Sequence, residues 1–442
     1  MADIASKLKK RDLYLNRLLA FRDTDLIKVI TGIRRCGKSS LLKLMSDYLR
    51  ADGIEEDQII EINFESMEFL SMDSKEFYAY VKERALKNKK LYLFFDEVQR
   101  VERWQDAVNS FRVDFNCDIY ITGSNAHLLS SELSTYLAGR YVEIKMLPLS
   151  FKEFIYFHGF TVKEIESPSG GHLKRVINSA GDIFDPKEVL ESYIMFGGMP
   201  GIADIGLNQE KVLTLLDGIY SAVVVRDILE RKNKTGRPQI TNPDLLRKII
   251  MFLADNIGSS TSVSSIGNTL VNEGLLDEGP RRVKPAAQTV QGYVNSLIEA
   301  FIFYEAKRYD IKGKEYLRTL GKYYIVDTGL RNYLLGFRDI DTGHTLENLV
   351  YFELFRRGYD VSIGKIDRKE IDFIATKADE KRYIQVTQSL IAPETREREL
   401  APLRMVRDNY KKEVIALEAD FITDQDGIKI VKLIDFLLED YS

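Results

Sequence analysis

One segment of eight residues constrains the fold of this chain more than any other. Residues 32–39 read GIRRCGKS, which fits the pattern G-x-x-x-x-G-K-[ST]. The segment stands between a β-rich apolar run at 27–31 and a stretch with helical spacing that begins at Ser39. The two glycines let the backbone wrap around phosphate oxygens, and the helix start adds partial positive charge. This order predicts a loop that binds the phosphates of a nucleotide.

Each position of the loop has an expected role. We expect Lys38 to contact the β- and γ-phosphates of ATP and Ser39 to bind Mg²⁺. The remaining candidate contacts to the nucleotide are Gly32, Arg34, Arg35, Cys36, Gly37 and Ser40. The two arginines bind phosphates, bind nucleic acid or are simply solvated. Cys36 is either a small neutral spacer or an exposed thiol whose oxidation would block nucleotide binding.

Strands and helices alternate through the first third of the chain. The expected strands are 27–31, 58–64, 91–95, 119–122 and 141–147, and the expected helices are 39–50, 74–87, 104–113 and 126–139. Alternation of this kind predicts an α/β domain with a parallel sheet and helices on both faces, over residues 1–150.

Polar residues at the ends of these strands complete the candidate site. Asp96 is expected to hold Mg²⁺ through water, and Glu97 to orient or deprotonate the attacking water. Either Ser124 or Asn125 is expected to contact the γ-phosphate or the attacking water, unless the pair only caps a helix. Arg140 is expected to act as an arginine finger across a subunit boundary in a homo-oligomer, or to be a surface arginine.

Composition narrows the class of protein. The chain has 442 residues, and its 63 Lys+Arg against 67 Asp+Glu leave a net charge of −4, which argues against a uniformly basic nucleic-acid coat but not against one basic face. No apolar run approaches the ~18 residues of a membrane span. Two cysteines and four histidines argue against a disulfide framework and a His/Cys zinc site, and they favour the cytoplasm.

The middle of the chain is expected to be mainly helical. Residues 151–256 form a helical lid or linker region in which 164–186 are a long exposed loop, and FGGMP at 196–200 is a packing corner without chemistry. Residues 257–337 are expected to form a helix (262–273), a turn, a second helix (286–301) and a β-hairpin, and this order is typical of a winged helix.

A winged helix predicts DNA as a possible partner. Its second helix follows a basic segment at 281–285, and the residues of the wing include Lys307, Arg308, Lys312, Lys314, Arg318 and Lys322. The alternatives are that this region packs on the ATPase domain and transmits its state to a protein partner, or that the charges are a solvated face.

Several strings together resemble the AAA-like P-loop ATPases of bacteria and archaea. The strings are TGIRRCGKSSLL, FFDEVQRVERWQ, ITGSNAHLL, LAGR, LPLSFKEF, FGGMP, TVQGYVNSLIEAFIFYEAKRYDIKGKEYL and KYYIVDTGLRNYLLG. The resemblance implies an AAA_14-type ATPase domain followed by an uncharacterised region of the DUF4143 type. It also implies ATP hydrolysis with Mg²⁺. The absence of a guanine-recognition string N-K-x-D favours ATP over GTP.

Residues 338–442 resemble the restriction-endonuclease-like fold. Glu347 and Asp372 match its first two carboxylates, and Glu370 shares a strand face with Asp372. Gln385 and Thr387 stand where such nucleases carry an acid and a lysine, so the site is expected to be degraded. Lys369 is the substitute lysine that the sequence offers, and a domain kept for interaction is the favoured interpretation.

Together these features predict an ATPase that couples hydrolysis to a conformational change of its C-terminal regions. The alternatives are a nucleotide-gated DNA-binding regulator with slow hydrolysis, and a Mg²⁺-dependent nuclease.

Overall fold

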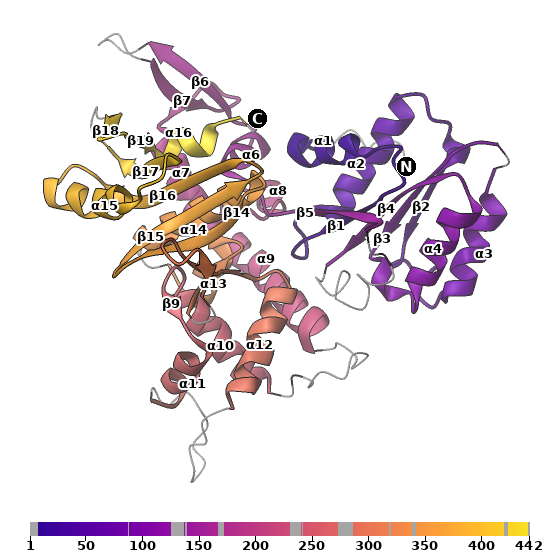
Figure 1. Cartoon of the computed structure of the whole chain (residues 1–442). Helices are drawn as coiled ribbons and strands as arrows, with labels where there is room; N and C mark the ends of the chain where they lie inside the picture. The colour runs from indigo at the N-terminus through magenta and orange to yellow at the C-terminus, as the bar shows by residue number, and fades with distance from the viewer. Residues whose placement is uncertain are drawn as a thin grey trace. The chain divides into compact units, whose positions relative to one another are not determined.

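The computed structural model describes residues 8–86, 88–124, 137, 139–166, 172–229, 240, 242–272, 286–317, 320–337, 342–419 and 423–440. The chain divides into two compact units (Figure 1). The first unit is Met1–Pro148 with Glu299–Phe301, and the second is Leu149–Ile298 with Ile302–Ser442. The division after Pro148 coincides with the predicted end of the first α/β block. No helix of the described residues is long and apolar enough to cross a membrane.

The first unit contains a five-stranded sheet in the order β2-β3-β4-β1-β5. The strands are β1 (Ile27–Thr31), β2 (Ile59–Asn63), β3 (Leu91–Asp96), β4 (Cys117–Gly123) and β5 (Tyr141–Lys145). All neighbours pair in parallel, as predicted. Every residue of β1 and β3 is buried, because helices cover both faces of such a sheet.

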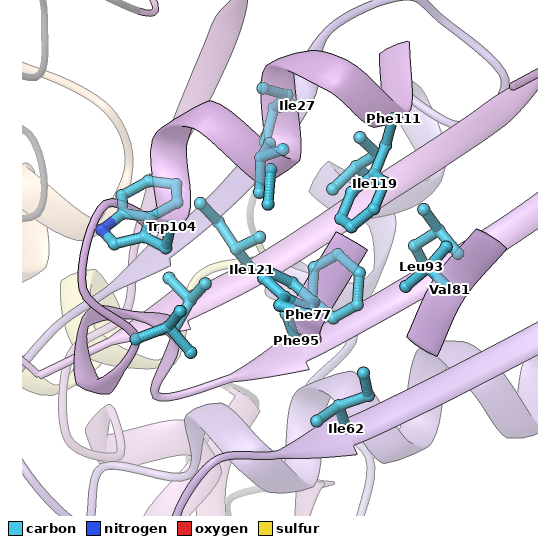
Figure 2. Packing of buried hydrophobic residues seen from close by; sticks show 14 of the residues in the cluster. Ile27, Ile62, Phe77, Val81, Leu93, Phe95, Trp104, Phe111, Ile119 and Ile121 are labelled. Carbon is cyan, nitrogen blue, oxygen red and sulfur yellow. The ribbon is translucent and has the colours of Figure 1, made fainter. Parts of the chain in front are cut away.

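The helices of the first unit are α1 (Asp12–Ala20), α2 (Lys38–Ala51), α3 (Ser74–Arg84) and α4 (Trp104–Asp114). Three phenylalanines join α3 and α4 to the sheet (Figure 2). The ring of Phe77 meets those of Phe95 and Phe111 edge to face, at centroid distances of 4.7 and 5.1 Å. The predicted helix at 126–139 lies outside the described residues for nearly all its length.

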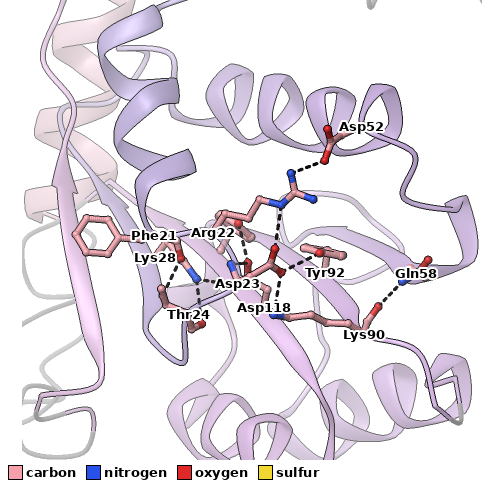
Figure 3. A network of polar contacts seen from close by, with 11 residues as sticks. Phe21, Arg22, Asp23, Thr24, Lys28, Asp52, Gln58, Lys90, Tyr92 and Asp118 are labelled. Atoms are coloured by element: carbon pink, nitrogen blue, oxygen red, sulfur yellow. Dashed lines mark hydrogen bonds and ion pairs between the residues drawn. The ribbon is translucent and has the colours of Figure 1, made fainter.

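A buried polar network closes the edge of this sheet at which β1 and β4 begin (Figure 3). Lys28 forms an ion pair with Asp118, and both side chains are fully buried. The second carboxylate oxygen of Asp118 accepts hydrogen bonds from the Asp23 backbone N–H at 2.8 Å and the Tyr120 hydroxyl at 2.9 Å. The Tyr92 hydroxyl donates to Asp23 at 2.9 Å. The network satisfies charges that would be costly to bury alone.

The second unit begins with α6 (Phe151–Phe157) and a small antiparallel sheet, β6-β7-β8. The strands are β6 (Thr161–Glu166), β7 (His172–Ile177) and β8 (Ile183–Phe184), so the predicted loop at 164–186 is wrong. Leu173, Val176 and Ile177 give this segment the apolar and β-branched content that is typical of a strand, and the Pro- and Gly-containing residues 168–171 stand between the two strands in the sequence. The helices that follow are α7 (Pro186–Phe196), α8 (Ile202–Ile205), α9 (Gln209–Ala222), the π-helix η5 (Val223–Leu229) and α10 (Pro243–Asp255).

The FGGMP string forms a corner against the loop before α13 (Thr328–Leu335). Gly197 has φ +82°, and an added Cβ would lie 2.2 Å from the Asp327 carboxylate. Gly198 donates its backbone N–H to the same carboxylate at 2.6 Å and accepts from the Leu149 N–H at 2.7 Å. The predicted packing corner is therefore confirmed, and its partner is Asp327.

A three-stranded antiparallel sheet lies beyond α10, in the order β10-β13-β9. Its strands are β9 (Ser260–Thr261), β10 (Phe303–Ala306) and β13 (Gly321–Ile325), with α11 (Val263–Asn272) and α12 (Ala287–Glu299) between β9 and β10. The predicted hairpin over 301–326 is divided between two sheets. Strands β11 (Arg308–Asp310) and β12 (Glu315–Tyr316) join the C-terminal sheet, where β11 pairs in parallel with β14.

The C-terminal sheet has eight strands in the order β12-β11-β14-β15-β16-β17-β19-β18. Its further elements are α14 (Thr342–Arg356), β14 (Asp360–Ile366), β15 (Lys369–Lys377), β16 (Glu380–Ser389), α15 (Pro393–Met405), β17 (Lys411–Glu418), β18 (Asp424–Gln425), β19 (Ile428–Lys432) and α16 (Leu433–Leu438). The predicted order of helix, three strands, helix and strand is confirmed. The hydrophobic core of this domain includes Ile371, Ile374, Tyr383, Leu400 and Val414.

Candidate nucleotide-binding site

The glycines of the loop after β1 hold backbone conformations that other residues rarely adopt. Gly32 has φ +146°, and a Cβ there would lie 2.1 Å from the Met146 carbonyl oxygen. Gly37 has φ +104° and immediately precedes α2. The first glycine thus permits close backbone approach, and the second permits the turn into the helix.

The Lys38 side chain forms hydrogen bonds with backbone carbonyl groups of its own loop. Lys38 is buried, and its Nζ donates to the carbonyl oxygens of Gly32 at 2.9 Å and Ile33 at 3.2 Å. Ser39 and Ser40 are exposed in the first turn of α2. The ammonium group, the exposed hydroxyls and the positive end of the helix are therefore at one place, as anion binding requires.

A buried arginine outside the motif fastens the loop. The guanidinium of Arg11 donates to the carbonyl oxygens of Cys36 at 3.0 Å, Leu147 at 2.9 Å and Pro148 at 3.2 Å. Cys36 is fully buried, and burial raises the pKa of its thiol. The structure therefore favours the spacer role for Cys36 over the exposed thiol. Nothing in the sequence around Arg11 indicates its contact with the loop.

The two loop arginines differ in their surroundings. Arg34 donates to Glu65 at 2.7 Å, and Arg100 donates to the same carboxylate oxygen at 2.9 Å. Burial acts to raise the pKa of Glu65, but the two guanidinium groups hold it below its usual range. Arg35 is exposed, with φ +63°. Simple solvation therefore describes Arg35 better than Arg34.

The predicted acidic pair is held by a hydroxyl of the neighbouring strand. Asp96 ends β3 and Glu97 follows it with φ +55°, and both are buried. The Thr122 hydroxyl on β4 donates to Asp96 Oδ1 at 2.5 Å and accepts from the Glu97 backbone N–H at 2.9 Å. Ser124 Oγ donates to Glu97 Oε2 at 3.3 Å, and Gln99 also donates to this carboxylate. The sequence predicted a contact from Ser124 or Asn125, after β4, but not the role of Thr122. Asn125 lies outside the described residues.

The structure does not bring Arg140 to the loop of its own chain. Arg140 is exposed, and its carbonyl oxygen accepts from the backbone N–H of Ile27 at 2.9 Å, at the start of β1. The loop follows the other end of β1, which is about 13 Å away for a strand rising ~3.3 Å per residue. A contact between Arg140 and a nucleotide would therefore require a second subunit.

The second predicted site is brought together on β15, β16 and α14, with one unexpected member. Lys322 of β13 places its Nζ 2.8 Å from Glu370 Oε1 and 3.3 Å from Glu347 Oε2. Asp372 accepts from the Val386 backbone N–H at 2.8 Å, and its own N–H donates to Gln385 Oε1 at 2.8 Å. Lys322 is 4% exposed, so it takes part neither in the DNA contact nor in the solvated face that the sequence predicts for the charges of the wing.

Comparisons with known proteins place two family models on the chain. An AAA domain matches residues 24–155, and a domain of unknown function, DUF8612, matches residues 187–341, where the sequence strings predict a DUF4143 region.

Two relatives match nearly the whole chain. An uncharacterized protein of Haemophilus influenzae is 42% identical over 97% of this chain and 98% of its own length. An uncharacterized protein of Methanocaldococcus jannaschii is 31% identical over 91% of this chain and 84% of its own length. Among solved structures, a Walker-type ATPase of Pyrococcus abyssi covers 74% of this chain and 95% of its own, with 16% identity and a TM-score of 0.47.

Proposed function

The chain belongs to one family with the Haemophilus influenzae and Methanocaldococcus jannaschii proteins and carries an AAA domain, and from this premise we propose that it is an ATPase. It binds ATP and Mg²⁺ in the cytoplasm, hydrolyses ATP, and couples the reaction to a conformational change of its C-terminal regions. One observation carries the proposal: the loop after β1 and the Asp96–Glu97 pair at the end of β3 lie at the carboxyl edge of one parallel sheet. Ligands of open α/β sheets bind at this edge.

Lys38 and Glu97 would have different roles in the reaction. Lys38 would exchange its carbonyl partners for the β- and γ-phosphates, and the backbone of residues 32–37 would surround them. Glu97 would orient or deprotonate the attacking water, with Ser124 bound to its carboxylate.

The side chains present also suit Mg²⁺, which prefers hydroxyl, carboxylate and water oxygens. Ser39 offers an exposed hydroxyl in the first turn of α2, and Asp96 offers a carboxylate at the end of β3. When bound, Mg²⁺ neutralises charge that develops on the phosphates.

The proposal is tested by comparing Glu97→Gln and Lys38→Ala with wild type in ATP binding and single-turnover hydrolysis. We expect Glu97→Gln to bind ATP but to lose about 10²–10⁴-fold in rate, and Lys38→Ala to lose nucleotide affinity. Glu83→Gln, an exposed substitution on α3, is the control. Wild-type hydrolysis by Glu97→Gln would refute the assignment of the base, and unchanged binding by Lys38→Ala would refute the loop.

A nucleotide-gated DNA-binding regulator is the second candidate function. The order β9, α11, α12, β10, β13 with the sheet β10-β13-β9 supports a winged helix, whose second helix would be α12. Three exposed amide side chains lie on α12, Gln288, Gln291 and Asn295, and amides of this kind can read adenine. The basic segment 281–285 and Arg318 lie outside the described residues.

DNA stimulation of turnover, together with DNA affinity that falls with salt, would support this second candidate. We expect Gln291→Ala with Asn295→Ala to weaken DNA binding without changing basal hydrolysis. DNA affinity that is absent, or that is independent of salt, would leave a protein partner as the target of the conformational change.

A further inference from the structure

The carboxylates of the C-terminal domain surround a lysine from another sheet. Glu347 lies on α14, Glu370 and Asp372 lie on β15, and Lys322 reaches them from β13. Burial acts to lower the pKa of Lys322, but Glu347, Asp372 and Glu370 raise it above its ordinary value. The ammonium group of Lys322 lies within ion-pair distance of Glu370, at 2.8 Å, and of Glu347, at 3.3 Å, and it neutralises part of the negative charge of the cluster.

One oxygen of each carboxylate that a divalent cation would need already has a partner. Glu370 and Glu347 each direct a carboxylate oxygen at Lys322 Nζ. One Asp372 oxygen accepts from the Val386 N–H, and Gln385 uses Oε1 for the Asp372 N–H and Nε2 for Glu399, at 3.0 Å. Among the described residues, no group of three or more His, Cys, Asp or Glu side chains has a geometry that could hold a metal ion.

Mg²⁺, which a restriction-endonuclease-like site would hold, does not fit this arrangement. Lys322 Nζ lies 2.8 Å from Glu370 Oε1 and 3.3 Å from Glu347 Oε2, so a divalent cation that bound these oxygens would have to displace the ammonium group. Thr387, which stands at the position of the nuclease lysine, carries no charge. Lys369, the substitute that the sequence offers, is exposed at the start of β15.

We propose that Lys322 is the built-in cation of the carboxylate cluster, so that the cluster joins β13 to the C-terminal sheet instead of binding a metal for nucleic-acid cleavage. A second contact at the same junction supports this role. Asn348 of α14 accepts from the Ile325 N–H and donates to the Ile325 carbonyl oxygen, both at 2.9 Å. The Tyr324 hydroxyl donates to Glu347 at 3.4 Å. Lys322, Tyr324 and Ile325 thus tie one strand to one helix.

Removal of the ammonium group provides the test. We expect Mn²⁺, added to the nucleotide-free full chain, to raise the melting temperature of Lys322→Ala by ~3 °C or more. The same Mn²⁺ should not shift wild type beyond the shift of the control Lys312→Ala, whose exposed lysine pairs with Asp367 at 2.6 Å. The Mn²⁺ effect should disappear when Asp372→Asn is added to Lys322→Ala. A folded Lys322→Ala that gains no Mn²⁺ stabilisation would overturn the proposal.

A measurement on the native lysine keeps the proposal testable if Lys322→Ala does not fold. We expect calorimetric Mn²⁺ titrations of wild type and Asp372→Asn to agree, because Asp372 binds no metal while Lys322 is present. Loss of a Mn²⁺ site in Asp372→Asn would refute the proposal. So would Mn²⁺-dependent plasmid cleavage by wild type that Asp372→Asn abolishes.

Discussion

At the residue scale, a hydroxyl on β4 determines how the acidic pair of the nucleotide site is held. Thr122 is fully buried, donates to the Asp96 carboxylate and accepts from the Glu97 N–H. Glu97 has a positive φ, which is uncommon for a residue with a side chain and indicates a conformation that its surroundings maintain. Thr122 is therefore a positioning residue for both acidic side chains.

Replacement of Thr122 by valine removes this hydroxyl and keeps the shape of the side chain. We expect Thr122→Val to hydrolyse ATP about 10–100-fold more slowly while ATP affinity changes little, because the buried Glu97 N–H and Asp96 lose their partner at a cost of about 1–3 kcal/mol. Single-turnover rates and equilibrium ATP binding would measure the two effects. Thr122→Ser retains the hydroxyl and should recover most of the rate; equal losses in both variants would contradict the positioning role.

At the scale of elements, the contact of the FGGMP corner with Asp327 joins the segment after α7 to the start of α13. Burial raises the pKa of Asp327 to about 6, although the N–H groups of Gly198, Leu330 and Gly329 act to lower it. The folded-state pKa thus lies above the ordinary aspartate value of 3.8. Asp327 contributes this stability fully below pH about 3.8 and loses it as pH rises through about 6.

This shift predicts how the stability of the second unit depends on pH. We expect the stability advantage of wild type over the non-titrating variant Asp327→Asn to decrease by about 2 kcal/mol from pH 4 to pH 7. Urea unfolding followed by circular dichroism would measure it. The single tryptophan, Trp104, lies in the first unit, so its fluorescence identifies the other transition. A pH-independent difference would show that Asp327 is charged throughout this range.

At the scale of the whole molecule, the proposed catalytic role of Arg140 depends on the formation of a homo-oligomer. Its place at the start of β5 keeps it away from the loop of its own chain. A role in hydrolysis therefore requires a neighbouring copy, in which it would stabilise charge on the transferred phosphoryl group.

Mixing two inactive variants tests this role. We expect Arg140→Ala and Lys38→Ala each to hydrolyse ATP at least about 10³-fold more slowly than wild type. A mixture should recover a measurable fraction of wild-type activity, because an intact loop of one variant meets Arg140 of the other. Arg84→Ala, an exposed arginine on α3, should be fully active alone. Full activity of Arg140→Ala, or no recovery in a mixture that forms mixed oligomers, would exclude an arginine finger.

Local sequence patterns by themselves determined the fold class of the first unit. The GIRRCGKS string, the buried strand before Asp96 and the alternation of strands and helices predicted the parallel sheet that the first unit contains. These features are readable because each depends on neighbours within a few residues: backbone geometry at glycines, helix starts and the burial of continuous apolar runs.

The tertiary structure alone decided which distant residues share a site. Arg11 reaches the loop from 25 residues away, Thr122 reaches Asp96 from the next strand in the sheet, and Lys322 enters a carboxylate cluster that the sequence assigned to another domain. Charge patterning predicted Lys322 as a DNA-contacting or solvated residue of the wing, because a lysine in a polar segment is usually exposed. Its partners are carboxylates of α14 and β15, which lie 25 and 48 residues further along the chain, and no local pattern encodes such pairings.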